Sequence, residues 1–315
     1  MKNIHQLTVP TPFEVGDVHI YLIVDEAVSL IDAGVNTEEA KHSLLHQLRK
    51  LGYHPEDIDQ VILTHHHPDH VGLIESFPTA KIIAHPNVDY WLKEDEAFLA
   101  HYEQYYRALL VKAGVDQRIA EQINNLKLLM QFAGTGKLHG SLQEGDTLPG
   151  HEDWKVIETK GHAQTHLSFY REKDGLFIGG DHLLLHTSPN PIVEAPYNGE
   201  SERPKPLLQY RKNLMKCRDL AISTVLPGHG EVFSNVKDYV DERLHSQERR
   251  AKKVYELLQK EHLTPFELSK KLFPKHYIKQ LELTMSETIG QLDYLMEEDK
   301  VSFKMQDGIM YFLAK

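Results

Sequence analysis

The segment Thr64-His65-His66-His67-Pro68-Asp69-His70 follows a short β-type run that begins at residue 59. Its H-x-H-x-D-H pattern places three imidazoles and a carboxylate within six positions. Because side chains alternate along extended backbone, His65 and His67 can face one side, while Asp69 and His70 lie just beyond the turn. Burying so many polar rings without a partner would be costly. Since neutral imidazole is the commonest side-chain ligand for zinc-like metals, the segment predicts a metal site at the end of a strand.

Three later residues of ligand type stand in matching contexts. His162 follows the β-type run 154–160, Asp181 follows the run 176–180, and His229 follows the run 222–226. Each lies beside glycines, which allow sharp turns and close approach of the backbone. Together with the first segment, these residues predict one site assembled from several strand ends.

Around these residues the chain alternates β and α signals. Residues 19–24 and 28–34 favour a hairpin that turns at 25–27, and a helix is expected from Thr37 to Gly52. Further strands are expected at 59–64, 80–85, 153–161, 166–181 and 222–230, with a helix around 205–220. Two β-rich halves, each followed by helices, predict an α/β protein built as an αββα sandwich.

A helical insertion is expected at about 87–138. Its pattern favours two long helices, 91–114 and 117–132, hinged near Gly114. Aromatic residues are dense in the first helix. They can pack a helical hairpin onto the domain, or line an apolar substrate pocket beneath a lid, and the sequence leaves both interpretations open.

The composition changes again after about residue 235. A long helix, a short helix that begins with Thr264-Pro265, a further helix at 283–299 and a β hairpin at Asp307-Gly308 have the layout of a winged helix-turn-helix. Domains are therefore expected at 1–235 and 236–315. Residues 245–315 carry 12 Lys/Arg and 11 Asp/Glu, a net charge of +1. A winged helix that reads nucleic acid usually has a clear basic excess, so packing or homodimer contacts are favoured for this tail. Four lysines near the helix-turn-helix keep nucleic-acid binding open: Lys270, Lys271, Lys275 and Lys279.

The bulk composition fits a globular protein of a reducing compartment. The chain has 315 residues, a net charge of −11 with histidine neutral, 21 histidines and one cysteine. That cysteine, Cys217, lies in a helical pattern and is interpreted as a small buried hydrophobe. No apolar run approaches the ~20 residues of a membrane span, and the N-terminal residues lack the pattern of a signal peptide. A cytoplasmic location without membrane association is therefore expected.

The motif series HHHPDH, GH at 161–162, GGD at 179–181 and PGHG at 227–230 resembles the metallo-β-lactamase superfamily, with hydroxyacylglutathione hydrolase (glyoxalase II) as the most similar branch. The resemblance covers about 20–230. It implies that one metal ion is held by His65, His67 and His162, a second by Asp69, His70 and His229, and that Asp181 bridges the two. It also suggests that His166 supports the site. His182, which directly follows Asp181, is a further candidate around the site, as a contact for substrate or a proton. Nitrogen and oxygen ligands without a thiolate suit Zn²⁺, and also Fe or Mn.

The resemblance also implies a reaction. A hydroxide that bridges two divalent metal ions would attack a carbonyl carbon, and Asp69 would orient it. The expected function is hydrolysis of a small thioester, ester or lactone substrate. Two alternatives use similar ligands: a metal-dependent ribonuclease or phosphodiesterase, and a mononuclear iron sulfur dioxygenase.

Overall fold

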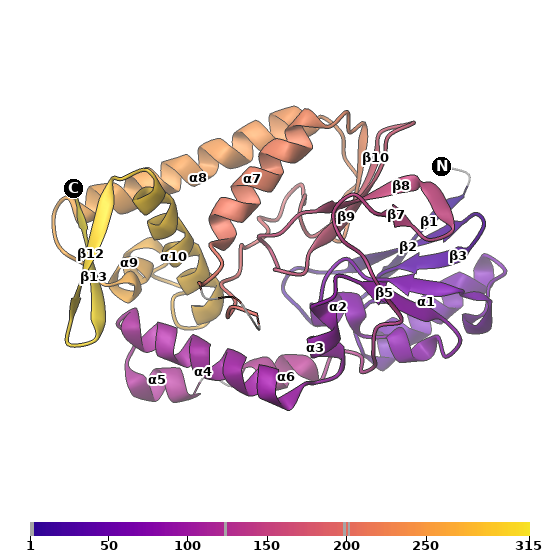
Figure 1. Ribbon diagram of the computed structural model, residues 1–315, viewed down its shortest axis with the longest axis horizontal. Helices are drawn as coiled ribbons and strands as arrows, with labels where there is room; N and C mark the ends of the chain where they lie inside the picture. The colour runs from indigo at the N-terminus through magenta and orange to yellow at the C-terminus, as the bar shows by residue number, and fades with distance from the viewer. Residues whose placement is uncertain (1–2, 123–124, 198–199, 201) are drawn as a thin grey trace.

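Two mixed β-sheets form the centre of the computed structural model, which describes residues 3–122, 125–197, 200 and 202–315 (Figure 1). The first sheet has the order β1 (Ile4–Val9), β2 (Val18–Val24), β3 (Val28–Ile31), β4 (Gln60–Ile62), β5 (Lys81–Ala84) and β6 (Gly140–Ser141). The second has the order β11 (Thr224–Pro227), β10 (Leu176–Gly180), β9 (Leu167–Arg171), β8 (His151–Glu158) and β7 (Thr147–Leu148). Strands β3 to β6 run parallel, as do β10 and β11, and the other neighbours are antiparallel.

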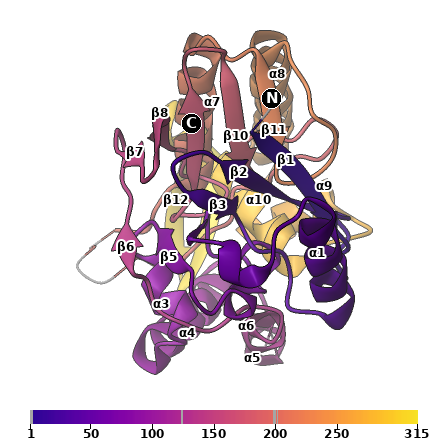
Figure 2. The same ribbon diagram turned by 90° about the vertical axis from the view of Figure 1, so that its right-hand side faces the viewer.

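The sheets pack face to face and carry helices on their outer faces. The layer between them is apolar, with Ile31 and Ile62 of the first sheet in one cluster with Trp154 and Phe169 of the second. Helix α1 (Glu38–Lys50) covers the first sheet, while α7 (Pro206–Asp219) and α8 (Val236–Leu258) cover the second. Figure 2 shows these layers stacked one above another. The predicted αββα sandwich is confirmed, and Cys217 is buried within the α7 layer, as expected.

Most elements of the sandwich lie where the sequence predicts them. Strands β2 and β3 form the expected hairpin, and Thr37 caps α1 by accepting a hydrogen bond from the Ala40 backbone N–H. Strand β1 and the two-residue strands β6 and β7 were not predicted from the sequence. Strand β1 pairs in register with β2 along its whole length, and this pairing partner rather than local composition makes it a strand.

The helical insertion departs from its prediction. The expected helix 91–114 is two helices, α3 (Val88–Leu92) and α4 (Glu96–Lys112). The chain breaks because Glu94 takes a left-handed conformation (φ 48°) and the Asp95 carboxylate caps α4 by accepting from the Phe98 N–H at 2.8 Å. The expected second helix, 117–132, appears as α5 (Gln117–Gln122) and α6 (Asn125–Met130), and residues 123–124 lie outside the described residues.

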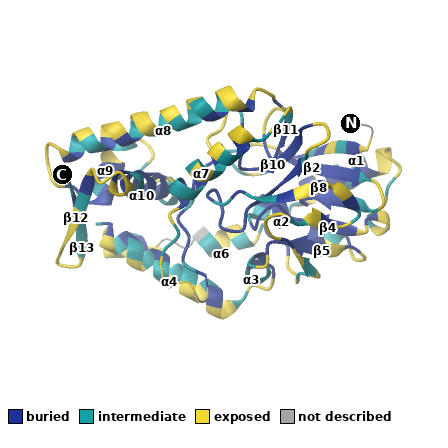
Figure 3. Ribbon diagram, turned by 45° about the horizontal axis from the view of Figure 1, so that its top comes forward, coloured by how far each residue is buried: buried dark blue, intermediate teal, exposed yellow. Residues whose placement is uncertain are grey.

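The C-terminal segment, residues 236–315, has the predicted order of three helices and a hairpin: α8, α9 (Pro265–Leu272), α10 (Leu281–Glu297), β12 (Val301–Gln306) and β13 (Ile309–Ala314). Thr264 and Glu267 form the capping box of α9, and Asp307 and Gly308 turn the hairpin with positive φ. Helix α10 is unusual because every residue from 284 to 293 is buried (Figure 3). Across the described residues, no helix is both long and apolar enough to cross a membrane.

Candidate metal centre

The histidine-rich segment leaves the first sheet at the end of β4 and turns into the short helix α2 (Pro68–Val71). Pro68 is the first helical residue, and His67 before it still has extended backbone (φ −65°, ψ 146°). His65 and His67 therefore share one side of the chain. The ring of His66 points elsewhere and stacks on Trp91, with ring centroids 4.0 Å apart. The segment thus presents alternate imidazoles to a common point, as the sequence predicts.

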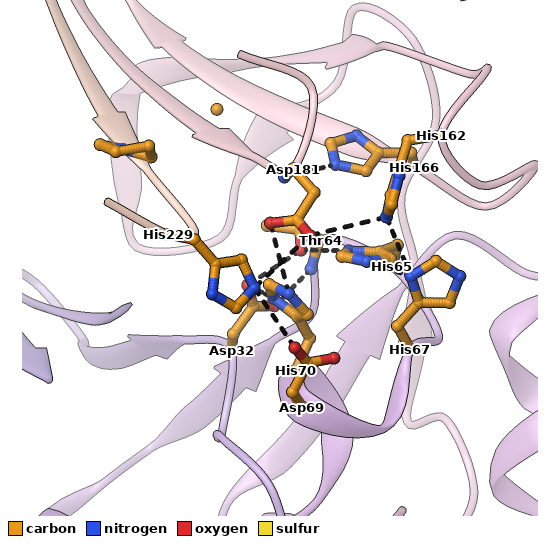
Figure 4. Close-up of polar contacts among 12 residues, drawn as sticks. Asp32, Thr64, His65, His67, Asp69, His70, His162, His166, Asp181 and His229 are labelled. Carbon is orange, nitrogen blue, oxygen red and sulfur yellow. Dashed lines mark hydrogen bonds and ion pairs between the residues drawn. The ribbon is translucent and has the colours of Figure 1, made fainter. Parts of the chain in front are cut away.

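The later ligand-type residues reach the same point from the second sheet (Figure 4). His162 follows β8, Asp181 follows β10 and His229 follows β11, each at the C-terminal end of its strand. Two glycines make room there. A Cβ on Gly180 (φ 48°) would lie 2.8 Å from Nε2 of His166, and a Cβ on Gly228 would lie 2.3 Å from Oδ1 of Asp181. The close packing of backbone against these side chains explains the GGD and PGHG motifs.

The structure brings all seven predicted ligands together. Three groups of candidate ligand atoms form: His65, His67 and His162; Asp69, His70 and His229; and a group of His65, His70 and Asp181 that shares a histidine with each of the other two. Within each group all atoms lie within 4.8 Å of one another. The Asp181 carboxylate lies between the first two groups. Its Oδ1 is 3.4 Å from Nε2 of His70, and its Oδ2 is 3.5 Å from Nε2 of both His162 and His229. This is the geometry of a carboxylate shared by two sites.

Hydrogen bonds fix the tautomers of the first group. The Thr64 hydroxyl donates its one proton to Asp32 (2.9 Å), so it accepts from Nδ1–H of His65 at 2.9 Å. Nδ1–H of His162 donates to the carbonyl oxygen of Asn190 at 3.1 Å. Both rings therefore keep a lone pair on Nε2. These two Nε2 atoms each lie 3.0 Å from Nδ1 of His67.

The second group is oriented in the same way. His70 donates from Nδ1–H to the Asp32 carboxylate at 2.8 Å, and His229 donates from Nδ1–H to the carbonyl oxygen of Asp17 at 2.7 Å. Nε2 of both rings and Oδ1 of Asp181 are buried without a hydrogen-bond partner among the described residues. Buried polar atoms are normally satisfied, so these atoms point to a ligand that is itself electron-poor.

Divalent metal ions fit this donor set. Lone pairs of nitrogen and oxygen converge from both groups. Four of the imidazoles are held by a hydrogen bond at the other ring nitrogen, as is usual for metal-binding histidines: His65, His70, His162 and His229. The donors are imidazoles and carboxylates, which suit Zn²⁺, Fe or Mn. The His/Asp clusters could therefore bind metal ions, one in each group.

Asp32 is the functional residue that the sequence analysis missed. It follows β3 directly, adopts φ 65°, and is buried. Its carboxylate accepts from the Thr64 backbone N–H (2.7 Å), from the Thr64 hydroxyl and from His70. One carboxylate thus sets the tautomer of His70 directly and that of His65 through Thr64. The available signal was a lone acidic residue at a strand end beside Gly34.

His166 and His182, both predicted around the site, lie in different surroundings. Nε2 of His166 accepts from the Asp181 backbone N–H at 3.0 Å, and its Nδ1–H donates to Thr159 at 2.7 Å. His166 therefore holds the backbone that carries Asp181. His182 is fully buried, with its ring edge-on to Tyr210 at 5.1 Å. That position places it behind the centre rather than at a surface that substrate reaches.

The candidate metal-binding histidines differ in the direction in which their surroundings shift the imidazole pKa. Burial, followed by the neighbouring imidazoles, holds the pKa of His65 and of His67 well below the ordinary range. At His70, burial acts in the same direction, but nearby carboxylates, Asp181 and Asp32 foremost, raise the pKa well above the ordinary range. A cation bound beside His70 must displace that proton, because a ligating imidazole nitrogen carries none.

An apolar pocket opens beside His67. About 110 Å³ of space is lined by His66, His67 and Pro68, by Trp91, Tyr102 and Tyr106, by Leu126, Leu129 and Met130, and by Ile192, Val193 and Glu282. The lining comes from four parts of the chain: the histidine-rich segment, the helical insertion, the segment that follows β10, and helix α10. A substrate held here would have its apolar part in the pocket and its reacting group near the metal ligands.

A buried carboxylate behind the pocket yields a stability prediction. Glu194 is 1% exposed and accepts from the Gln164 N–H (2.8 Å) and the Tyr197 hydroxyl (3.1 Å). Burial raises the pKa of Glu194 from 4.5 to about 7. The folded state therefore keeps a proton that the unfolded chain gives up between these pH values, so the free energy of unfolding falls as pH rises through that window. The fall corresponds to about 3 kcal/mol.

We expect the Glu194→Gln variant to lose most of this slope, since it carries no titrating group. The measurement is urea unfolding at several pH values between 4.5 and 7.5. Glu202→Gln is the matched control, because this carboxylate is close in sequence but exposed, and it should keep the slope of the unchanged protein. An equally steep slope in the Glu194→Gln variant would contradict the prediction.

Comparison with known proteins places this centre in a family. The model of the metallo-β-lactamase superfamily matches residues 14–229. Probable metallo-hydrolase YqjP of Bacillus subtilis is 38% identical over 312 residues, covering 99% of this chain and 98% of that protein. N-acyl homoserine lactonase AiiB of Agrobacterium fabrum is 32% identical over 162 residues, 46% of this chain and 56% of that protein. The crystal structure of metallo-β-lactamase family protein TTHA1429 from Thermus thermophilus matches with a TM-score of 0.85 at 26% identity, covering 100% of this chain and 99% of that one. The matched region spans all seven candidate ligands, and the chain belongs to the metallo-β-lactamase superfamily as a metallo-hydrolase.

Proposed function

We propose that the chain hydrolyses a small thioester, ester or lactone that carries an apolar acyl group, with two divalent metal ions of which Zn²⁺ is the first candidate. The observation that carries this proposal is the apolar pocket beside His67, because it offers a place for an acyl chain next to the metal ligands. Two divalent ions bound there supply a bound water with a lowered pKa and positive charge beside the carbonyl group.

The residues of the chain would divide the work. The two histidine groups hold the metal ions, and Asp181 lies between them. Asp69, whose Oδ2 is 3.2 Å from Nε2 of His229, is the proposed residue that orients the attacking water. Thioesters suit this site because a thiolate leaves with little protonation. The name of AiiB, a lactonase, supports the inclusion of lactones.

The nuclease alternative has less support. In a helix-turn-helix, the second helix enters the major groove and needs an exposed face. Helix α10, which occupies that position after α9, is buried from residue 284 to residue 293. The chain also has a net charge of −11, which opposes broad contact with phosphate backbones. Both observations favour a small substrate.

The proposal is tested by metal analysis and a substrate panel. Elemental mass spectrometry of the purified protein should give about two Zn, Fe or Mn per chain. The metal-loaded protein should cleave at least one class in a panel of thioesters, esters and lactones, and His67→Ala should abolish that cleavage. Degradation of RNA that depends on His67, with every panel member untouched, would overturn the proposal. One iron per chain with oxidation of a persulfide would favour the dioxygenase instead.

The pocket gives a sharper prediction on chain length. Replacing Met130 of α6 with tryptophan should fill part of the space and exclude the end of a long acyl chain. Because each excluded CH₂ forfeits about 0.8 kcal/mol, the loss of two should lower kcat/KM for an octanoyl thioester about 10-fold. Hydrolysis of the acetyl thioester should change little, since its acyl group lies near the metal ligands.

The matched control is Leu128→Trp, in the same helix. Leu128 is 59% exposed and does not line the pocket. It should leave the octanoyl-to-acetyl ratio of kcat/KM unchanged. An unchanged ratio in Met130→Trp as well would show that the acyl group binds elsewhere.

A further inference from the structure

A short segment, residues 190–193, forms two hydrogen bonds with the candidate metal ligand His162. The carbonyl oxygen of Asn190 accepts from Nδ1–H of the His162 ring at 3.1 Å (Figure 4 shows that ring among the other ligands). The backbone N–H of Ile192 donates to the His162 carbonyl oxygen at 3.4 Å. The first contact fixes the tautomer and rotation of the ring, and the second fixes the backbone that carries it. The position of this segment therefore determines where Nε2 of His162 points.

The same segment, residues 190–193, also forms hydrogen bonds with helix α10. The Asn190 side-chain amide donates from Nδ2 to the carbonyl oxygen of Leu283 at 3.0 Å. The backbone N–H of Val193 donates to Oγ of Ser286 at 3.1 Å, and that contact is buried. Because a buried backbone N–H without a partner is costly, the segment is expected to move rather than leave this group unsatisfied.

Helix α10 is itself held rigidly against the rest of the molecule. Met285 and Ile289 pack in one cluster with Tyr106 and Leu110 of α4. On another face, a Cβ added to Gly290 would lie 2.9 Å from Cβ of Leu207 in α7, so the two helices touch closely. In Figure 1, α10 lies between α7 above and α4 below.

An ion pair adds to this anchorage. One guanidinium nitrogen of Arg203 donates to both carboxylate oxygens of Asp293, at 2.6 and 2.8 Å. Helix α10 also reaches the substrate side, because Glu282 lines the same apolar pocket as Ile192 and Val193. One helix of the C-terminal segment thus contacts both the pocket and the segment that orients a metal ligand.

We propose that Asn190 and Ser286 are positioning residues for His162, so that helix α10 of the C-terminal segment completes the metal centre. Through residues 190–193, the packing of α10 sets the direction of a ligand that lies in the other half of the chain. The proposal rests on the metal centre of the proposed function and not on the substrate class. It gives the C-terminal segment a role in catalysis that needs no nucleic-acid partner.

The test uses Co²⁺ binding to the full chain after removal of its native metal. Co²⁺ has visible absorption bands whose position and intensity depend on the geometry of the ligands. In Asn190→Ala and in Ser286→Ala, we expect one binding step to weaken about 10-fold, the low end of the effect of residues that support a ligand. The absorption bands of that step should change as well, because His162 is no longer held in one orientation.

Thr288→Val is the matched control. Thr288 lies in the same helix, is fully buried, and donates its hydroxyl only to the Thr284 carbonyl oxygen at 2.7 Å. This variant also loses one buried hydroxyl, but it should bind Co²⁺ with the affinity and spectrum of the unchanged protein. Urea unfolding of all three metal-free variants shows whether their stabilities are comparable.

Wild-type Co²⁺ affinity and absorption bands in both Asn190→Ala and Ser286→Ala would overturn the proposal. An equal change in Thr288→Val would also overturn it, since the effect would then belong to helix stability alone. Neither readout involves a substrate. If the chain cleaved no thioester, ester or lactone, the substrate assignment would fail while the role of α10 could still be confirmed.

Discussion

The Asp181→Ala variant is expected to retain about one metal ion per chain instead of two. Its hydrolytic rate should fall by more than about 100-fold, a larger loss than is usual when only a supporting residue is changed. Asp181 is the carboxylate that approaches both ligand groups, through His70 on one side and His162 and His229 on the other. Its removal would leave the two proposed cations without the negative charge between them, and their mutual repulsion should expel one.

The measurement is elemental mass spectrometry together with kcat for the substrate identified by the panel. Asp174→Ala is the matched control, since Asp174 precedes the same strand, β10, but pairs with Arg171 in an exposed turn. It should keep both metal ions. Two ions and an unchanged rate in Asp181→Ala would mean that the two groups bind metal independently and that Asp181 does not bridge them.

The second large effect is expected from Asp32→Asn, which preserves size while changing hydrogen-bonding character. Asp32 accepts three hydrogen bonds, from the Thr64 N–H, the Thr64 hydroxyl and Nδ1–H of His70. An asparagine must turn its NH₂ group toward some of these donors. To avoid two donors facing each other, His70 should move its proton to Nε2, the atom that faces the second proposed metal site.

We therefore expect Asp32→Asn to weaken metal binding by the group of Asp69, His70 and His229 about 10- to 100-fold. Metal binding by the group of His65, His67 and His162 should weaken less. Metal content after dialysis against a weak chelator measures the difference. Asp59→Asn serves as control, because the exposed Asp59 also accepts from a strand-end backbone N–H, that of Val28 at 2.8 Å, but at the end of β3 opposite to Asp32. Equal metal retention in both variants would contradict the assigned role of Asp32.

The sequence could predict the strands and the candidate ligands because both depend on local signals. His162, Asp181 and His229 each follow a β-type run and stand beside glycine, and this context is visible in the chain itself. The layers follow from the same runs, since buried strands separated by helices have few ways to pack. The structure brings these residues together as the resemblance implies.

The sequence could not predict features that depend on hydrogen-bond partners with no recognisable sequence pattern. The hydrogen bonds that orient His162 and His229 end on the backbone carbonyl oxygens of Asn190 and Asp17, which any residue could supply. Asp32 looks like an ordinary turn residue until the fold places Thr64 and His70 around it. The break between α3 and α4 was also hidden, because several acidic residues stand together there and only Asp95 acts as the cap.

The ligands come from both sheets, and this has a consequence for the lifetime of the protein. His67 and His162 are 95 positions apart in sequence, and they belong to different halves of the sandwich. A metal ion bound by residues of both halves would act as a removable cross-link. At about 1,000 times its dissociation constant it would add about 4 kcal/mol to the stability of the folded state, a large part of the 5–15 kcal/mol typical of proteins. Removal of such a metal ion would therefore lower the stability of the protein as well as its activity.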